Sequence, residues 1–287
     1  MANTTSTTLT EMVPIIRAES MYALTHIAGI LDTLVIKNTL GGPGLIVEFP
    51  EWDAYTSSNV TASAEGTDDT TSITGQTNTN QATIGEHTIY TVITDLAQMT
   101  TQEDVVAKYS NILSYAMKAK LEDDVVSLFP SFSQTGCTAG TTMAEAHWWD
   151  SIRQIRVAGA PMNQIYAVLS PKSYYGAKGM RAMLDPDTGT PSGALGEELK
   201  TKGYVEHPFG IAGVLVSAEI DEDVATLGDA ANAIYAKGAI GLHTKGLFNV
   251  EIERNASLRA FEMVCVGRWG EVEIFDTFGV YNLADVA

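Results

Sequence analysis

Histidines and cysteines carry much of the metal-ion and nucleophilic chemistry of proteins, and in this chain they are few and scattered. The sequence contains five histidines and two cysteines. No two histidines have the spacing that presents two metal ligands on one helix face, and neither cysteine lies in a recognised nucleophile motif. These residues are His26, His87, His147, His207, His243, Cys137 and Cys265. We therefore expect no metal centre, no bound cofactor and no catalytic thiol.

Three acidic residues, Glu65, Asp68 and Asp69, lie close together in a stretch rich in Thr, Ser and Gly. General acid–base catalysis needs carboxyl groups held by a packed surround, which such a stretch does not supply. Residues 185–189 resemble the start of a calcium-binding loop, but the glycine and glutamate of a true loop are missing. Neither pattern predicts a site.

One enzymatic alternative remains, a hydrolase. Residues of the types that serine hydrolases use are present, for example Ser170, His207 and Asp221. The motif that places a nucleophilic serine at a strand–helix turn is absent, and nothing in the spacing brings these three together. The residues therefore favour a structural protein over an enzyme.

Composition excludes further classes of protein. The chain has 287 residues and a formal net charge of −18, which argues against a nucleic-acid binder because phosphate contacts need clustered Lys and Arg. No apolar run is long enough to span a membrane, and residues 1–10 lack the features of a signal peptide. The cysteines lie far apart and suggest no disulfide framework, so we expect folding in a reducing cytoplasm.

The longest helix signal runs from Thr101 to Phe129. It opens on a capping box at residues 100–103, keeps one apolar stripe in register and stops at Pro130. A single core helix of this length is unremarkable by itself, so its meaning depends on the strands in front of it.

Two strands are predicted before the helix, Gly44–Tyr55 and Thr88–Asp95, joined by a polar tip from Thr56 to Gln81. An isolated two-stranded ribbon is only marginally stable in water, and its edges are open to pairing. We therefore expect the hairpin to lie on a neighbouring copy of the chain. The predicted contact residues on it are Leu45, Val47, Trp52, Tyr55, Glu65, Ile89, Tyr90 and Ile93.

Charge is distributed unevenly along the chain. Between Lys37 and Lys108 there are ten acidic residues and no Lys or Arg. A neighbour that receives this acidic hairpin should offer a basic strip, for which the candidates are Arg153, Arg156, Lys172, Lys178 and Arg181. The three arginines are the predicted contacts. The alternative interpretation is an acidic surface that only favours solubility.

The rest of the chain mixes helices and strands, which predicts an α+β fold. The predicted elements are a helix over 10–40 interrupted near Pro14, a loop over 131–141, a helix from a capping box at 142–145, a strand at 165–169, a helix from Ser170–Pro171 to Leu184, strands at 211–217 and 233–237, and an antiparallel meander over 248–275 with turns at 255–257 and 268–270.

This order of parts resembles the major capsid protein of tailed bacteriophages, the Hong Kong Ninety-Seven type fold that encapsulins share. The local motifs that carry the resemblance are Ala64-Glu65-Gly66, the helix over 148–157 followed by Gly159 and Pro161, the segment 165–171, the glycine-containing strand 210–217 and Phe278-Gly279-Val280-Tyr281. The resemblance implies five parts: an N-terminal arm (1–43), an extended loop (44–99), a spine helix of the peripheral domain (100–140), an axial domain (141–245) and a peripheral sheet with a C-terminal strand (246–287).

The resemblance implies a subunit that assembles as hexamers and pentamers into an icosahedral shell around double-stranded DNA, without sequence-specific DNA binding and without a membrane. It further implies portal and scaffolding proteins as partners, with a cement or decoration protein as a further possibility. It places the protein in the virion after assembly in the bacterial cytoplasm. Nothing the size of a cleaved scaffolding segment precedes the arm. We therefore expect either that scaffolding is a separate protein or that this chain is already the mature form. The alternative is an encapsulin-like compartment that encloses a cargo enzyme.

Overall fold

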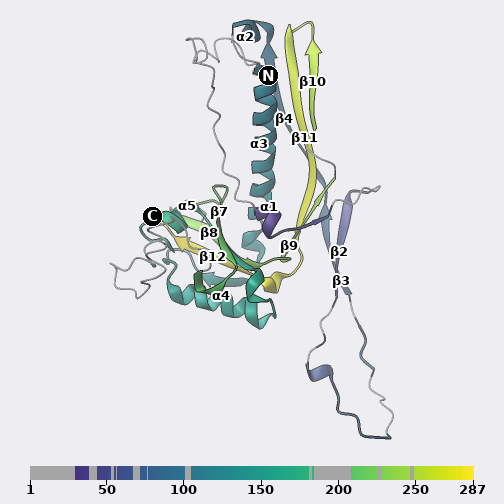
Figure 1. Ribbon diagram of the computed structural model, residues 1–287, viewed down its shortest axis with the longest axis vertical. Coiled ribbons are helices and arrows are strands. Elements are labelled where there is room, and N and C mark those ends of the chain that lie inside the picture. The colour runs from purple at the N-terminus through teal and green to yellow at the C-terminus, as the bar shows by residue number, and fades with distance from the viewer. Residues whose placement is uncertain are drawn as a thin grey trace.

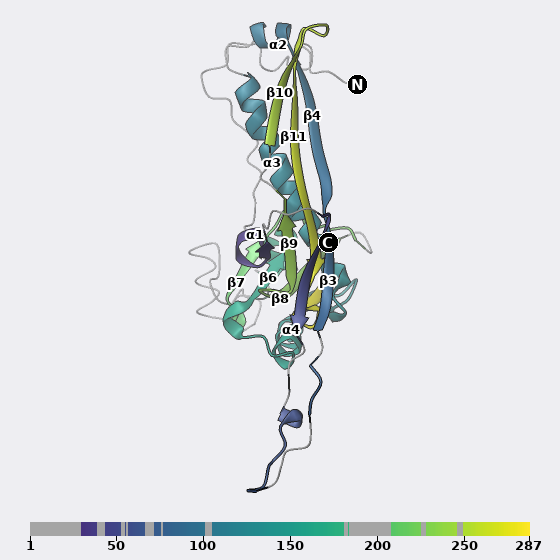
Figure 2. The same cartoon turned by 90° about the vertical axis from the view of Figure 1, so that its right-hand side faces the viewer.

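The computed structural model describes residues 30–38, 44–52, 55, 57–66, 72–75, 77–100, 105–180, 183, 208–224, 228–245 and 249–287. In it an elongated domain stands on a compact domain, and a narrow hairpin projects away from both (Figure 1, Figure 2). Within the described part of the chain, no helix combines the length and the apolar character needed to cross a membrane.

The helices are α1 (Ile30–Thr33), α2 (Asp95–Thr100), α3 (Val105–Val126), α4 (Glu145–Val157) and α5 (Pro171–Tyr175), with short 3-10 turns at 57–59, 129–131, 162–164, 208–210 and 276–278. The strands are β1 (Ile36–Asn38), β2 (Ile46–Trp52), β3 (Thr77–Thr83), β4 (Gly85–Thr94), β5 (Gln134–Cys137), β6 (Ile165–Leu169), β7 (Gly213–Val216), β8 (Asp229–Ala236), β9 (Ile240–Thr244), β10 (Asn249–Asn255), β11 (Ala260–Glu273) and β12 (Gly279–Asp285).

The elongated domain is a ribbon of strands laid along α3. β11 is its centre, because it pairs with β4 on one side and with β10 and then β9 on the other, while β1 adds to β9. α3 covers one face of this ribbon, as the predicted apolar stripe requires. The buried members of the stripe are Val105, Leu113, Met117, Leu121 and Val125.

The compact domain is a five-stranded mixed sheet in the order β5-β12-β8-β6-β7. Its helices begin at local signals: Ser170 Oγ accepts a hydrogen bond from the backbone N–H of Ser173 and so caps α5. At α4 the backbone N–H of Ala144 donates to Nδ1 of His147 at 3.0 Å. The predicted strand at 165–169 and the predicted cap at Ser170 are both confirmed.

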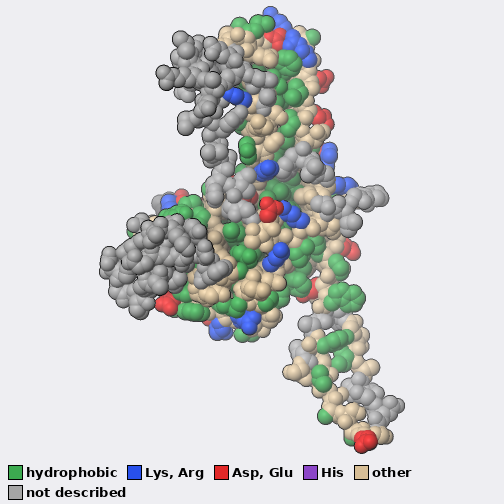
Figure 3. All heavy atoms as spheres, in the orientation of Figure 1, with side chains coloured by type: hydrophobic (Ala, Val, Ile, Leu, Met, Phe, Trp, Pro, Cys, Tyr) green, Lys and Arg blue, Asp and Glu red, His purple; other side chains and the backbone are tan. Residues whose placement is uncertain are grey.

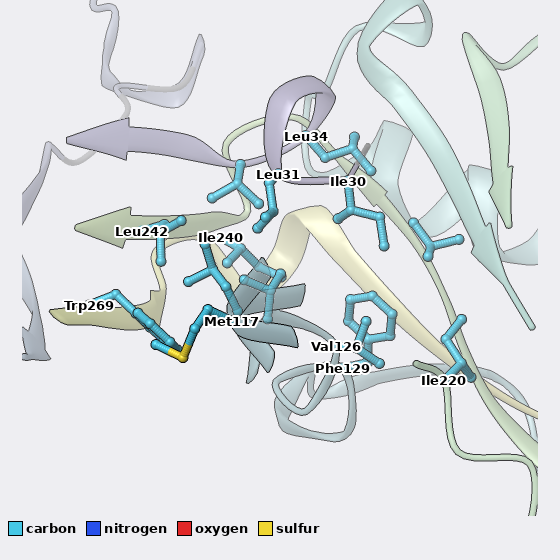
Figure 4. Packing of buried hydrophobic residues seen from close by; sticks show 14 of the residues in the cluster. Ile30, Leu31, Leu34, Met117, Val126, Phe129, Ile220, Ile240, Leu242 and Trp269 are labelled. Carbon is cyan, nitrogen blue, oxygen red and sulfur yellow. The ribbon is translucent and has the colours of Figure 1, made fainter. Parts of the chain in front are cut away.

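Two hydrophobic clusters cover the two faces of the compact sheet. One lies under α4 and α5 and contains Trp148, Ile155 and Leu169. The other joins the sheet to the end of α3 and to α1, and it extends into the elongated domain (Figure 4). Met117, Phe129 and Trp269 belong to this second cluster, so the two domains share a core and are not linked by a free hinge.

The hairpin differs from the predicted one in its second arm. β2 pairs with β3, Ile46 opposite Thr83 and Trp52 opposite Thr77, so residues 77–81 form strand and not tip. The predicted arm Thr88–Asp95 instead forms β4 in the elongated domain. β3 escaped prediction because it has no apolar alternation: only Ala82 is buried along its length.

The predicted turn at residues 268–270 is wrong, because β11 runs through it without a break. Gly270 is needed there for a different reason. A Cβ at Gly270 would lie 2.5 Å from the carbonyl oxygen of Thr83 and 2.8 Å from its carbonyl carbon. The glycine therefore permits the close approach of two backbones, a second use of glycine within strands.

Several boundaries move by a few residues or change type. The residues between the predicted strand at 88–95 and the predicted long helix form helix α2, and the predicted loop at 131–141 contains β5. α4 begins at Glu145 and not at residue 143, and α5 ends at Tyr175. The predicted start of the long helix at Thr101, the predicted helix before residue 30 and the calcium-loop resemblance at 185–189 lie outside the described residues.

The strands of the two sheets are not divided between residues 245 and 246, where the predicted axial domain ends and the predicted peripheral sheet begins. β9, which precedes this division, pairs with β11 in the elongated domain. β12, which follows it, lies between β5 and β8 in the compact domain. The chain therefore enters the compact domain twice and returns to the elongated domain once in between, so the predicted ranges give the order of the parts better than their membership.

Candidate assembly surfaces

The described histidines and cysteines have structural surroundings. His87 stacks on Trp269 with ring centroids 4.0 Å apart, and burial lowers the pKa of His243. Both cysteines are buried, and burial raises the pKa of the Cys137 thiol to about 11, which keeps it protonated and unreactive. Among the described residues no three His, Cys, Asp or Glu side chains gather closely enough to hold a metal ion.

The serine proposed for the hydrolase alternative, Ser170, has a structural role. Ser170 is fully buried, and its hydroxyl bonds to Ser173 within the first turn of α5. Its backbone N–H donates to Oδ1 of Asn232 at 2.8 Å. Asp221 is a turn residue that accepts from the backbone N–H of Asp223, and His207 lies outside the described residues. Ser170 is therefore placed as a helix cap and not as a nucleophile.

Among its described residues, the hairpin (44–83) is anchored to the body at its base. Phe49 and Ala82 are buried against Ile274 at the end of β11. The side-chain amide of Asn80 donates to the carbonyl of Ile274 at 2.7 Å. Gly241 lies beneath the same spot, where a Cβ would come within 3.0 Å of the Phe49 ring. The base of the hairpin therefore packs against the elongated domain at Gly241, which has no side chain to obstruct the Phe49 ring.

Beyond its base the hairpin exposes large apolar side chains. Trp52 is 76% exposed, Tyr55 61% and Val60 79%, and Ile73 is also exposed. In the space-filling view this part of the chain stands clear of the body, with apolar and acidic side chains on it and no basic ones (Figure 3). Exposed aromatic groups on a projecting ribbon indicate a surface that another chain covers.

The predicted contact residues within the described part of the chain lie in three places: on the hairpin, on β4 and on α4. Leu45, Trp52, Tyr55 and Glu65 are exposed on the hairpin, whereas Val47 is partly buried at its base.

The others lie elsewhere. Ile89 and Tyr90 are on β4, Ile89 partly buried against the core and Tyr90 43% exposed. Ile93 is fully buried in the core of its own chain, so its side chain has no surface to offer a neighbour and its prediction as a contact is corrected. Arg153 and Arg156 are exposed on α4, and Arg181 lies outside the described residues.

Sequence reasoning missed an apolar patch at the far end of the elongated domain. Leu96 and Met99 on α2 are 61% and 83% exposed, and Leu258 in the β10–β11 turn lies 46% exposed. The two segments are joined there, since the backbone N–H of Asp95 donates to the carbonyl of Arg259. The signal was available in residues 95–100, whose helix presents two large apolar residues with a single buried alanine.

Comparison with solved structures decides the fold. The chain superposes on the capsid structure of the cyanophage P-SCSP1u with a TM-score of 0.71 and 15% sequence identity, over 95% of this chain and 92% of that one. The chain has the tailed-phage capsid fold. The capsid of Myoviridae phage XM1 gives a TM-score of 0.64 at 13% identity, over 94% and 96% of the two chains. The capsid of an empty GTA particle gives 0.66 at 11% identity, over 99% of each.

The chain resembles known proteins in its fold and not in its sequence. No protein-family model matches the sequence, and no curated protein matches it either. The expected α+β capsid fold is confirmed by the superpositions over almost the whole chain. Within this capsid fold, α3 is the long helix, the ribbon around β11 lies along it, and the hairpin is the projecting loop.

Proposed function

We propose that this protein is a major capsid protein whose copies tile, as hexamers and pentamers, into the icosahedral head shell of a tailed phage around double-stranded DNA. The observation that carries the proposal is the hairpin, which exposes Trp52, Tyr55 and Val60 on a ribbon that its own body does not cover. In a chain with a capsid fold, copies of the same chain are the natural cover, because closed symmetric assembly repeats one contact many times.

Energetics support an assembled state. Fully burying a large apolar side chain contributes on the order of 1.5–3 kcal/mol, so covering three such residues at every repeated contact favours association. The contact would be non-covalent at the hairpin: residues 44–83 contain no lysine from which an isopeptide cross-link could start.

The role is structural and not catalytic. It implies assembly in the host cytoplasm, residence in the virion, a portal, and scaffolding or cement proteins that support the shell. The net charge of −18 suits a wall around packaged DNA, because like charge prevents adhesion to phosphate. No observation favours the encapsulin-like alternative, which shares the fold and differs in its contents.

Negative-stain microscopy and sedimentation velocity of the expressed protein test the proposal. Closed particles of uniform size, or rings of five and six subunits, are expected as concentration rises. A monomer or small oligomer at all concentrations, with and without molecular crowding agents, would contradict it. Particles that contain an enzyme in place of nucleic acid would point to the encapsulin-like alternative.

A further inference from the structure

The exposed face of α4 carries an aromatic and two basic side chains in one row. Trp149, Arg153 and Arg156 are spaced by four and three residues, which places them on the same side of a helix. The opposite side of α4 is buried in the compact domain through Trp148, Ile152 and Ile155. Trp149 remains 49% exposed, and Val157 beside the row is 79% exposed.

Trp149 is held in place although it is exposed. Its indole N–H donates to Oε1 of Glu145 at 3.0 Å, and its ring packs edge-on against Phe209 with centroids 5.6 Å apart. Phe209 is itself fixed against Trp148 and has a backbone φ of +55°, a conformation that costs free energy in a residue with a side chain. A rigid exposed tryptophan loses little entropy on binding, and Trp and Arg are the residues most enriched where interfaces draw their affinity.

The outer face of α4 carries two arginines together with the carboxylates of Glu145 and Asp150. Arg153 pairs with Asp150 at 2.7 Å, but the pair is exposed and of the kind that contributes little. Arg156 donates to the carbonyl of Ala160 at 2.7 Å, and no carboxylate in the described part of the chain pairs with it. Two arginines of the elongated domain do pair with carboxylates, Arg254 with Asp95 and Arg268 with Glu86.

The hairpin has the complementary composition. Residues 44–83 contain six acidic residues and no Lys, Arg or His. Glu48 and Glu65 are exposed, and the exposed Trp52 and Tyr55 lie between them in sequence. The exposed aromatic rings and carboxylates of the hairpin match the fixed Trp149 and the arginine of α4 that has no carboxylate partner, Arg156.

Both features lie at the same end of the molecule. The hairpin extends downward past the compact domain, and α4 forms the lower edge of that domain in both views (Figure 1, Figure 2). Basic side chains are visible along that lower edge (Figure 3). Subunits of a ring share one orientation about its axis, so features at the same end of neighbouring copies can meet.

We propose that the outer face of α4 is the docking surface for the hairpin of a neighbouring copy, with Trp149 as the apolar anchor and Arg153 and Arg156 as partners of the hairpin carboxylates. This rests on the proposed function, which supplies the second copy, and adds the surface that receives it.

Site-specific photo-cross-linking tests the docking directly. Trp149 is replaced by p-benzoylphenylalanine, and the protein is assembled as a mixture of isotopically light and heavy chains. Mass spectrometry of the irradiated particles should find adducts to peptides of residues 44–83 that join a light chain to a heavy one. The same photo-reactive residue at Tyr175, which is equally exposed in the compact domain but lies on α5, is the matched control and should not label the hairpin.

Charge reversal gives an independent measurement. Arg153→Glu with Arg156→Glu should lower the assembled fraction about tenfold or more, and Glu48→Lys with Glu51→Lys and Glu65→Lys should restore it when combined with the first pair. Normal assembly of the arginine variant, or particles in which position 149 labels no hairpin peptide, would overturn the docking while leaving the proposed function in place. An unmodified protein that forms no particles would overturn both.

Discussion

The hairpin and the ribbon of the elongated domain are both long antiparallel pairs, and they differ in what lies beneath them. In the ribbon, β4 and β11 pair from Gly85 opposite Trp269 to Thr94 opposite Ala260, and α3 covers one face. In the hairpin, β2 and β3 pair over a shorter span, from Ile46 opposite Thr83 to Trp52 opposite Thr77, and of these strand residues only Phe49 and Ala82 are buried. Strand pairing is thus common to both, and apolar cover decides which one is stable alone.

The comparison separates stability from assembly. Substitutions in the ribbon should act on the free energy of unfolding of the single chain. Substitutions in the hairpin should leave that free energy almost unchanged and act on association.

Shortening the hairpin should have the largest effect. Replacing residues 53–76 by Asn-Gly keeps β2 and β3 and joins them by a tight turn. We expect a folded chain with an unchanged circular dichroism spectrum and thermal midpoint but no closed particles by sedimentation and microscopy. Normal shells from this variant would remove the hairpin from the assembly mechanism.

Two tryptophan variants compare the regions at a single residue each. Trp269→Ala removes a buried ring that stacks on His87 and donates to Asp124 at 2.9 Å, and it should cost about 3–5 kcal/mol in denaturant unfolding. Trp52→Ala removes a ring that is 76% exposed, so the free energy of unfolding should change by less than about 0.5 kcal/mol while the assembled fraction falls. Equal effects of the two on unfolding would mean that the hairpin is covered by its own chain.

Gly270→Ala tests the joint between the two regions. The added methyl group would meet the backbone of Thr83 and Ile84, which cannot move as a side chain can. We expect a loss of about 1–3 kcal/mol and faster proteolysis within residues 44–83. Gly140→Ala, where no atom lies within 4 Å of the added Cβ but φ is +72°, controls for backbone strain alone.

The smallest effect concerns pH. Burial and then the nearby Asp124 raise the pKa of Glu271, so the folded chain binds its proton more tightly than the unfolded chain does. Stability from this group is therefore present at pH values below its unfolded pKa and is lost as pH rises through the higher folded pKa. Glu271→Gln should raise the thermal midpoint at pH 7 and reduce its change between pH 7 and pH 5.

Asp285→Asn provides the opposite sign for the same measurement. Its hydrogen bond to Lys178 lowers the pKa of the Asp285 carboxyl, so this group stabilises the fold above its unfolded pKa and loses that contribution as pH falls through the folded value. The variant should be less stable at pH 7. Changes of the same sign in both variants would contradict these electrostatic assignments.

Local signals predicted the local elements well. The stripe on α3, the strand at 165–169 and the cap at Ser170 all depend on residues close in sequence, and the structure has all three. The partner of β4 was not predictable in this way, because β11 lies far along the chain and any strand with an apolar face would satisfy the pattern.

The assembly surfaces show the same limit. Exposed hairpin residues such as Trp52 could be found from the polar tip and the charge pattern around them. Ile93 could not be separated from them, since alternation identifies a buried face but not which body buries it. Gly270 was misread as a turn because the close approach of Thr83 that requires it exists only in three dimensions.

β11 has a mechanical consequence. One unbroken strand pairs with β4 and β10 at its far end and with β9 at its near end, and the residue that follows it, Ile274, holds the base of the hairpin. A pull that a neighbour applies to the hairpin therefore acts along the length of this strand and loads its rows of hydrogen bonds together, in shear, where a pull across the strand would open them one by one. Pressure from within a filled shell would be spread over the whole elongated domain before any single bond had to yield.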